Sequence, residues 1–161
     1  MNTFNDIAVN LKNKLADTSE LSSVKFIMDS PSALSPNPIS KIYATVGISK
    51  IVVSEGSFSG YLGLNSGEEV YGKLADIKIK IKIYSPQSLN SDSCYEGFSK
   101  IYEALLTDNS GFNVQSVSCD EIGYDNVVSA FTLASYVNIS TFIGYETTNT
   151  DIENILIAKS Y

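Results

Sequence analysis

Residues 75–84 alternate between apolar and polar side chains almost without a break. This period of two predicts a β-strand, because successive side chains of a strand point to opposite faces of its sheet. We expect one face to be covered by other parts of the chain and the other to look at water or at a partner. The apolar face carries Ile77, Ile79, Ile81 and Ile83, and the other face carries Lys78, Lys80, Lys82 and Tyr84.

Two segments show helical spacing instead. In residues 3–16 apolar side chains recur every three or four positions, and Asp6 suits the positive end of the helix dipole. Residues 91–106 repeat this pattern, and Ser93 and Glu96 have the spacing of a capping box. We predict two amphipathic helices that cover the isoleucine face. Their apolar stripes are Phe4, Ile7, Ala8, Leu11 and Leu15, and then Cys94, Phe98, Ile101, Leu105 and, at the margin, Tyr102.

Four further segments have the character of strands. Residues 24–28 form a short one, and 41–53 form a longer one whose apolar phase slips by one residue near Ser49 and Lys50, which predicts a β-bulge. Residues 112–120 form a third, with Val114 as its core position. Residues 127–143 separate into two faces, but a strand of this length exceeds the usual range, so we expect it to bend or to break near Ser135.

The connections are rich in proline and glycine. Residues 29–40 hold three of the four prolines and predict a connecting arm. Residues 55–72 hold half of the ten glycines and predict a long Gly-rich protruding loop or hairpin. The aromatic and aliphatic residues within it are candidates for contacts with a partner or with neighbouring subunits. These candidates are Phe58, Tyr61, Leu62, Leu64 and Tyr71, together with Lys78, Lys80 and Lys82.

The order of these elements predicts an α+β fold, in which a mostly antiparallel β-sheet carries two helices packed on one face. We expect residues 1–146 to form a single domain. Residues 147–161 would add a C-terminal arm, which is compatible with either a short helix or an added strand. A chain of 161 residues is long enough to bury a core of its own.

Composition narrows the possible chemistry. The net charge is −7, and all eleven basic residues are lysines, with no arginine and no histidine. General nucleic-acid binding is disfavoured by this charge, and imidazole catalysis is excluded. Cys94 and Cys119 are too few for a zinc site or a disulfide framework, and we expect them to be small buried residues. We therefore predict no enzyme activity, no cofactor and no metal.

Several features together resemble the tail terminator, or tail-completion, proteins of long-tailed bacteriophages and phage-tail-like bacteriocins. They are the helix Phe4–Leu15, the arm Asp29–Ser40, the strand Asp76–Tyr84 leading into the helix Ser93–Leu106, and the β-stretch Val127–Tyr145. The resemblance implies a ring, usually a hexamer, that caps the tail tube, stops its polymerisation and joins it to the neck or head. It implies a tail tube protein as partner, with sheath or neck proteins as further candidates.

Other functions stay open at this stage. The chain could be another phage neck or baseplate adaptor, a small hydrolase that uses carboxylates or a Ser/Lys pair, or a carrier whose isoleucine face lines a ligand cavity. No apolar run is long enough to span a bilayer, and no signal peptide is recognisable, so we expect no membrane partner. The expected location is the bacterial cytoplasm during assembly, and then the phage or phage-tail-like particle.

Overall fold

The computed structural model describes residues 4–29, 39–54, 61–65, 68–106, 111–148 and 151–158; for 62–70, 144–148 and 151–158 only the backbone is considered. The fold is α+β, with two helices and a mostly antiparallel sheet. The helices are α1 (Phe4–Ala16) and α2 (Asp92–Leu106). The strands are β1 (Val24–Met28), β2 (Ile42–Ser54), β3 (Tyr61–Asn65), β4 (Glu68–Pro86), β5 (Val114–Cys119), β6 (Gly123–Asp125), β7 (Ala130–Thr148) and β8 (Asp151–Ala158).

The sheet has the strand order β1-β2-β4-β7-β5. β3 pairs with β4, and β6 and β8 pair with β7. Only β1 and β2 are parallel, and the other pairs in the described sheet are antiparallel. β4 and β7, each 19 residues long, pair along almost their whole length and form the long central pair of the sheet. Two short 3₁₀ turns, Ser19–Leu21 and Gln87–Leu89, join helices to strands.

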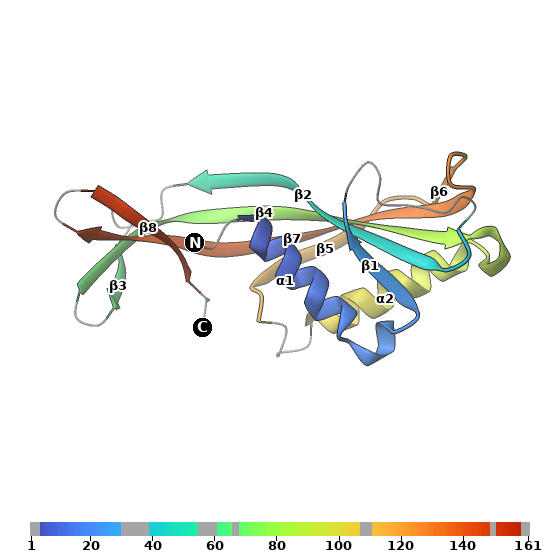
Figure 1. Cartoon of the computed structure of the whole chain (residues 1–161), viewed down its shortest axis with the longest axis horizontal. Coiled ribbons are helices and arrows are strands. Elements are labelled where there is room, and N and C mark those ends of the chain that lie inside the picture. Colours follow the sequence, from blue (N-terminus) through green and yellow to red (C-terminus); the bar gives the residue numbers. More distant parts are fainter. Residues whose placement is uncertain are drawn as a thin grey trace.

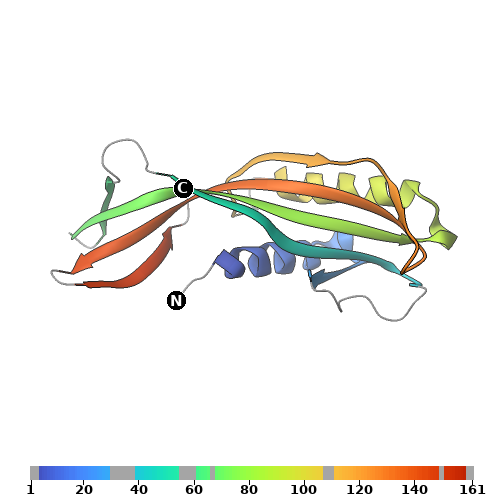
Figure 2. The same ribbon diagram turned by 90° about the horizontal axis from the view of Figure 1, so that it is seen from above.

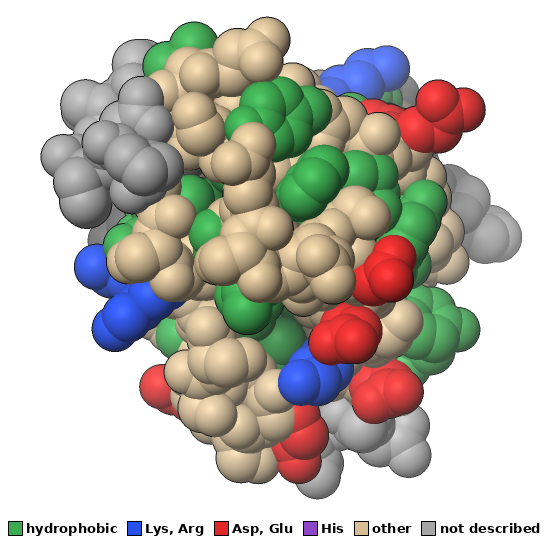
Figure 3. Space-filling view, turned by 90° about the vertical axis from the view of Figure 1, so that its right-hand side faces the viewer, with side chains coloured by type: hydrophobic (Ala, Val, Ile, Leu, Met, Phe, Trp, Pro, Cys, Tyr) green, Lys and Arg blue, Asp and Glu red, His purple; other side chains and the backbone are tan. Residues whose placement is uncertain are grey.

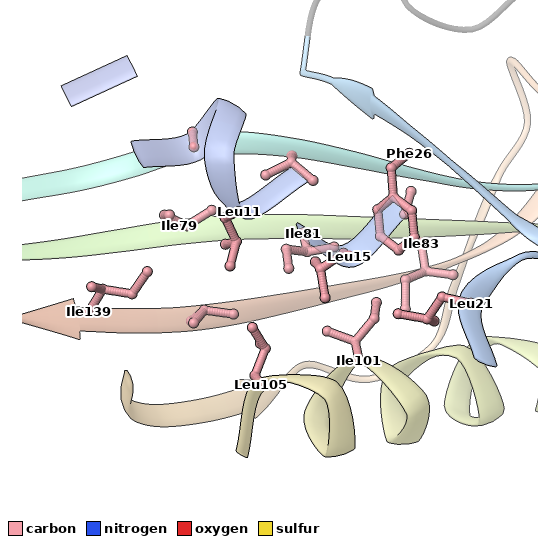
Figure 4. Packing of buried hydrophobic residues seen from close by; sticks show 14 of the residues in the cluster. Leu11, Leu15, Leu21, Phe26, Ile79, Ile81, Ile83, Ile101, Leu105 and Ile139 are labelled. Carbon is pink, nitrogen blue, oxygen red and sulfur yellow. The ribbon is translucent and has the colours of Figure 1, made fainter. Parts of the chain in front are cut away.

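Both helices lie on the same side of the sheet (Figure 1), as the sequence predicts. The four isoleucines of β4 are buried there. Leu11 and Leu15 of α1 and Ile101 and Leu105 of α2 converge on them (Figure 4). The isoleucine face is thus the centre of the hydrophobic core and packs against helices.

Beyond the helices, the sheet continues as a narrow β-extension. β4 and β7 run past the helical layer and carry β3 and β8 at their far ends (Figures 1 and 2). The molecule is therefore elongated, with a helix-covered body at one end and a β-extension at the other. β7 runs through the boundary predicted at residue 146, and β8 folds back onto it, so the last described segment is a strand.

The predicted bulge is confirmed, since the β2–β4 register shifts between Ile48 and Lys50. The predicted break of β7 near Ser135 is wrong. Ser135 lies on the core face opposite Ile81, and its hydroxyl donates a 2.9 Å hydrogen bond to the Ile81 carbonyl. A buried serine whose hydroxyl is satisfied in this way does not interrupt the strand.

The long Gly-rich loop predicted over 55–72 is not observed. Residues 61–65 form β3 and 68–72 begin β4, while 55–60 and 66–67 lie outside the described residues. The described part corresponds to the alternative prediction of a hairpin, because β3 and β4 pair antiparallel. Most of the Pro-rich arm, residues 30–38, also lies outside the described residues.

Candidate assembly surfaces

The sheet face opposite the helices, here called the open face, carries the lysines of β4. Cross-strand register places Lys78 beside Lys50 and Asn138, and Lys80 beside Gly47 and Tyr136. The three β4 lysines are partly exposed, in contrast to the buried isoleucines between them. In the described residues no helix covers this face, which Figure 2 views.

Aromatic rings hold two of these lysines. The Lys78 ammonium lies 4.1 Å from the centroid of the Tyr136 ring, and the Lys82 ammonium lies 4.7 Å from that of Tyr84. Lys82 also pairs with Asp125 at 3.6 Å. Cation–π contacts at such exposed sites contribute about 0.5–1 kcal/mol each. They orient the two side chains along the sheet instead of leaving them to sample solvent.

Lys80 differs from its neighbours. Among the described residues, no carboxylate and no aromatic ring is paired with it. It stands beside Gly47, where a Cβ atom would lie 2.7 Å from the Cβ of Asp29, the residue that follows β1, so glycine leaves the room that Asp29 needs. Lys80 is therefore a partly exposed cation available to an acidic partner.

The acids of the open face are already engaged by hydroxyl groups. The Ser140 hydroxyl donates to Asp76 at 2.8 Å, and the Tyr136 hydroxyl donates to Asp120 at 3.1 Å. This bond to the Asp120 carboxylate raises the pKa of Tyr136. These hydrogen bonds link neighbouring strands and hold the two carboxylates in place, and neither pair combines a nucleophile with an oriented base of the kind that acyl transfer uses.

One end of the open face is closed by a second small cluster. Tyr84 is 8% exposed and packs with Ile39, Val128 and Ala130. The sequence pattern placed Tyr84 on the lysine face, where the structure has it, but Tyr84 is buried there by other parts of the chain. The cover comes from distant segments, which periodicity within one strand cannot reveal.

The predicted interaction residues fall into two separate groups. Tyr61 is exposed and lies edge-to-face with Tyr71, with ring centroids 5.7 Å apart. Leu62 and Leu64 belong to β3, where only the backbone is described, and Phe58 lies outside the described residues. Tyr71 and Lys78 are seven residues apart on β4, or about 23 Å along an extended strand. The hairpin group and the lysine group are therefore different surfaces.

A third surface, at the end of β2, was not predicted from the sequence. All residues from Ser49 to Ser54 are exposed. Ile51, Val52 and Val53 are 37%, 42% and 47% exposed. The available signal was three consecutive β-branched residues, which one covered face cannot accommodate.

The remaining exposed apolar side chains are dispersed. Tyr95, Tyr102 and Leu106 lie on the outer side of α2, so Tyr102 does not belong to the buried stripe. At the end of the molecule near β6, hydrophobic side chains are scattered among uncharged polar ones (Figure 3). Single exposed apolar residues of this kind are normal on protein surfaces.

Neither cysteine forms a disulfide. Cys94 lies in the first turn of α2 with its side chain buried in the core, and burial raises the pKa of its thiol to about 11. Cys119, at the end of β5, is only half-buried. Within the described ranges, no group of three His, Cys, Asp or Glu side chains could hold a metal ion. No described helix is long and apolar enough to cross a membrane.

Comparison with known proteins does not assign the chain to a family. No protein-family model matches the chain, and no curated protein matches it in sequence. The function must therefore be argued from the sheet, its extension and its exposed edges.

Proposed function

We propose that this chain is a structural assembly protein resembling a phage tail terminator, which forms a ring, caps a tail tube and halts its polymerisation. The ring also offers a surface to the neck or head. The observation that carries the proposal is the open architecture of the sheet. Its described part has one helix-free face, two different unpaired edges and a β-extension that reaches past the helices.

A closed ring needs two different contact surfaces on every subunit, because each copy meets its two neighbours through unlike patches. The described sheet ends in β1 and β2 on one side and in β5 on the other. These two edges are unlike, as a ring requires. The resemblance stated above implies six copies.

The tip of the β-extension is the proposed contact with the tail tube. It carries Tyr61 and Tyr71, and Leu62 and Leu64 lie on the same hairpin. Tyrosine covers a large contact area at a low entropy cost, which suits a docking tip. The lysine group on the open face is the proposed site for an acidic neighbour, with Lys80 as its unpaired cation.

The overall charge agrees with this role. A net charge of −7 would repel DNA that passes through a ring instead of binding it. An enzyme is a weaker proposal, because the chain has no histidine and no arginine. The ligand-carrier alternative needs the β4 isoleucines to line a cavity, and they pack against helix side chains instead.

The decisive experiment has two parts. Native mass spectrometry and negative-stain imaging of the purified chain should reveal a closed ring. Co-expression with a tail tube protein should then yield tubes that stop growing and carry the ring at one end. A strict monomer at high concentration would overturn the proposal. A ring that leaves tube growth unchanged would favour the neck-adaptor alternative instead.

A further inference from the structure

Among the described residues, no strand pairs with the outer edge of β2 over its second half. β1 pairs with β2 only from Ile42 to Val46, and a last backbone bond runs from the Asp29 amide to the Val46 carbonyl at 2.8 Å. From Ser49 onward every β2 residue is exposed, although β4 continues to pair with the inner side of β2 as far as Ser54. No described strand lies along the outer side of this segment.

Such an edge is a hazard unless something covers it. Unpaired backbone N–H and C=O groups beside exposed β-branched side chains form a template for pairing with another chain. Lysines on an edge are a common protection, and this one carries only Lys50 among Ile51, Val52 and Val53. The segment therefore fits a strand-pairing site better than a protected edge.

The opposite end of the same sheet offers a fitting partner strand. β5 is the last strand of the described order, and β7 pairs with only one of its sides. Because β2–β4, β4–β7 and β7–β5 are all antiparallel, β5 runs antiparallel to β2. If β5 of a second copy lay beside β2, the two sheets would continue as one, with all helices on the same side.

We propose that copies of this chain associate head to tail, with residues 50–54 of β2 paired antiparallel to residues 116–120 of the next copy. Both segments are free of irregularities, because the β2 bulge precedes Lys50 and the β5 irregularity precedes Ser116. The proposed register places five residues opposite five. The pairs are Lys50 with Asp120, Ile51 with Cys119, Val52 with Ser118, Val53 with Val117, and Ser54 with Ser116.

This register matches the two faces of the sheet. Ile51 and Val53 lie on the helix side, because they pair with Ile77 and Ala75. Cys119 and Val117 also lie on the helix side, because they pair with Ser135 and Val137 of β7. A shift by one residue would set these apolar side chains against the polar open face.

Charge supports the same register. Within one copy, Lys50 stands directly opposite Lys78, an unfavourable pair of like charges. The proposed register brings Asp120 of the next copy beside Lys50 on the open face. Asp120 is already oriented there, because it accepts a hydrogen bond from the Tyr136 hydroxyl.

The contact is heterologous, so repeated copies either close into a ring or form an open filament. The inference rests on the proposed function only in expecting closure into a ring. The pairing itself follows from the edges of the sheet. It deepens the proposal by naming the strands through which neighbouring subunits meet.

A native cysteine provides a specific test. The Ile51→Cys variant would place a thiol opposite the half-buried Cys119 of the next copy, at a spacing of about 5 Å between Cα atoms, which a disulfide can bridge. Mild oxidation should link most of the chain into covalent oligomers. Mass spectrometry of the digest should identify the bond between positions 51 and 119.

Three controls make the register visible. In Val53→Cys the new thiol would lie diagonally from Cys119, about 7–8 Å away between Cα atoms, and should cross-link far less. In Val52→Cys the new thiol would point to the opposite face. The double variant Ile51→Cys, Cys119→Ser should form none of these covalent oligomers, because the partner thiol is absent. Circular dichroism and urea unfolding check that each variant is folded.

The outcomes separate this inference from the proposed function. If the wild type forms a ring and the Ile51→Cys variant forms no link between positions 51 and 119, the edge pairing is overturned and the ring proposal stands. Links as frequent in Val53→Cys as in Ile51→Cys would overturn the register. A specific link in an assembly that does not cap tubes would support the pairing and overturn the terminator. A strict monomer would overturn both.

Discussion

At the residue scale, two glycines show how local space decides the effect of one methyl group. Gly97 lies in α2, where an added Cβ would sit 3.7 Å from Ile83, an ordinary contact. At Gly47 an added Cβ would sit 2.7 Å from the Cβ of Asp29. We expect Gly97→Ala to stabilise the fold by about 0.5–1 kcal/mol through helix propensity.

Gly47→Ala is the matched opposite, and we expect it to destabilise by about 1–3 kcal/mol, because β1 must move away. Urea unfolding of both variants beside the wild type measures the two free energies of unfolding. Equal effects of the same sign would show that the spacing around these glycines is not what decides stability.

Lys80, for which the described residues offer no ion pair and no ring contact, gives a second residue-scale prediction. Lys80→Glu removes no ion pair or ring contact known in the described residues, so its free energy of unfolding should change by less than about 0.5 kcal/mol. Assembly should weaken, because the new carboxylate would repel an acidic neighbour. Native mass spectrometry reports the loss of oligomer. A large loss of folding stability in this variant, with assembly unchanged, would show that the two faces of the sheet are assigned wrongly.

Cys94 gives a prediction about pH. Burial raises the pKa of its thiol from 9.0 to about 11, so the folded state keeps a proton that the unfolded state loses. The resulting stabilisation is complete below the unfolded pKa and is lost as the pH rises through the folded pKa. Stability should therefore fall between pH 9 and about 11 more steeply in the wild type than in Cys94→Ala. Urea unfolding across this range measures the difference; parallel curves would contradict it.

At the element scale, the sequence predicts a segment well when one of its faces is buried along its whole length and the other is exposed along its whole length. The isoleucines of β4 face helices and its lysines face solvent, so period two is unbroken there. Both helices and the bulge of β2 leave equally local signals. The lysine surface of β4 could be named for the same reason, whereas the hairpin residues were named for their aromatic and aliphatic side chains among glycines.

The elements that the sequence missed depend on neighbours. Residues 68–72 join β4 because β7 and β3 supply backbone hydrogen bonds on its two sides, and their sequence, Glu-Glu-Val-Tyr-Gly, shows no alternation of apolar and polar side chains. β7 stays continuous because Ser135 finds the carbonyl of Ile81 on another strand. The exposed edge of β2 depends on where β1 stops, which no local pattern shows.

The hairpin of β3 and β4 gives an element-scale prediction. Deletion of residues 57–66 removes β3 but leaves the start of β4 paired with β7. We expect a folded chain that still forms rings and no longer caps tubes, because the proposed docking tip is gone. Tube lengths in electron micrographs, with circular dichroism as the folding control, measure this. Normal capping by the deletion variant would show that the tip does not contact the tube.

At the scale of the whole molecule, two forces act against each other during assembly. Each copy carries a net charge of −7, so copies repel one another at long range. The proposed contact between β2 and β5 is short-ranged and consists of backbone pairing with apolar side chains. The pair of Lys50 and Asp120 helps to select the register of the two strands but adds little stability, because exposed ion pairs contribute about 0–1 kcal/mol.

This balance predicts how the oligomer responds to salt. At about 1 M salt the screening length falls to about 3 Å, which removes most of the repulsion between copies and leaves backbone pairing in place. The oligomer should therefore persist or grow more stable as salt rises, and Lys50→Ala should weaken it only slightly. Light scattering coupled to size exclusion at low and high salt measures the mass. Dissociation at high salt would mean that charge pairs, and not the strand edge, hold the copies together.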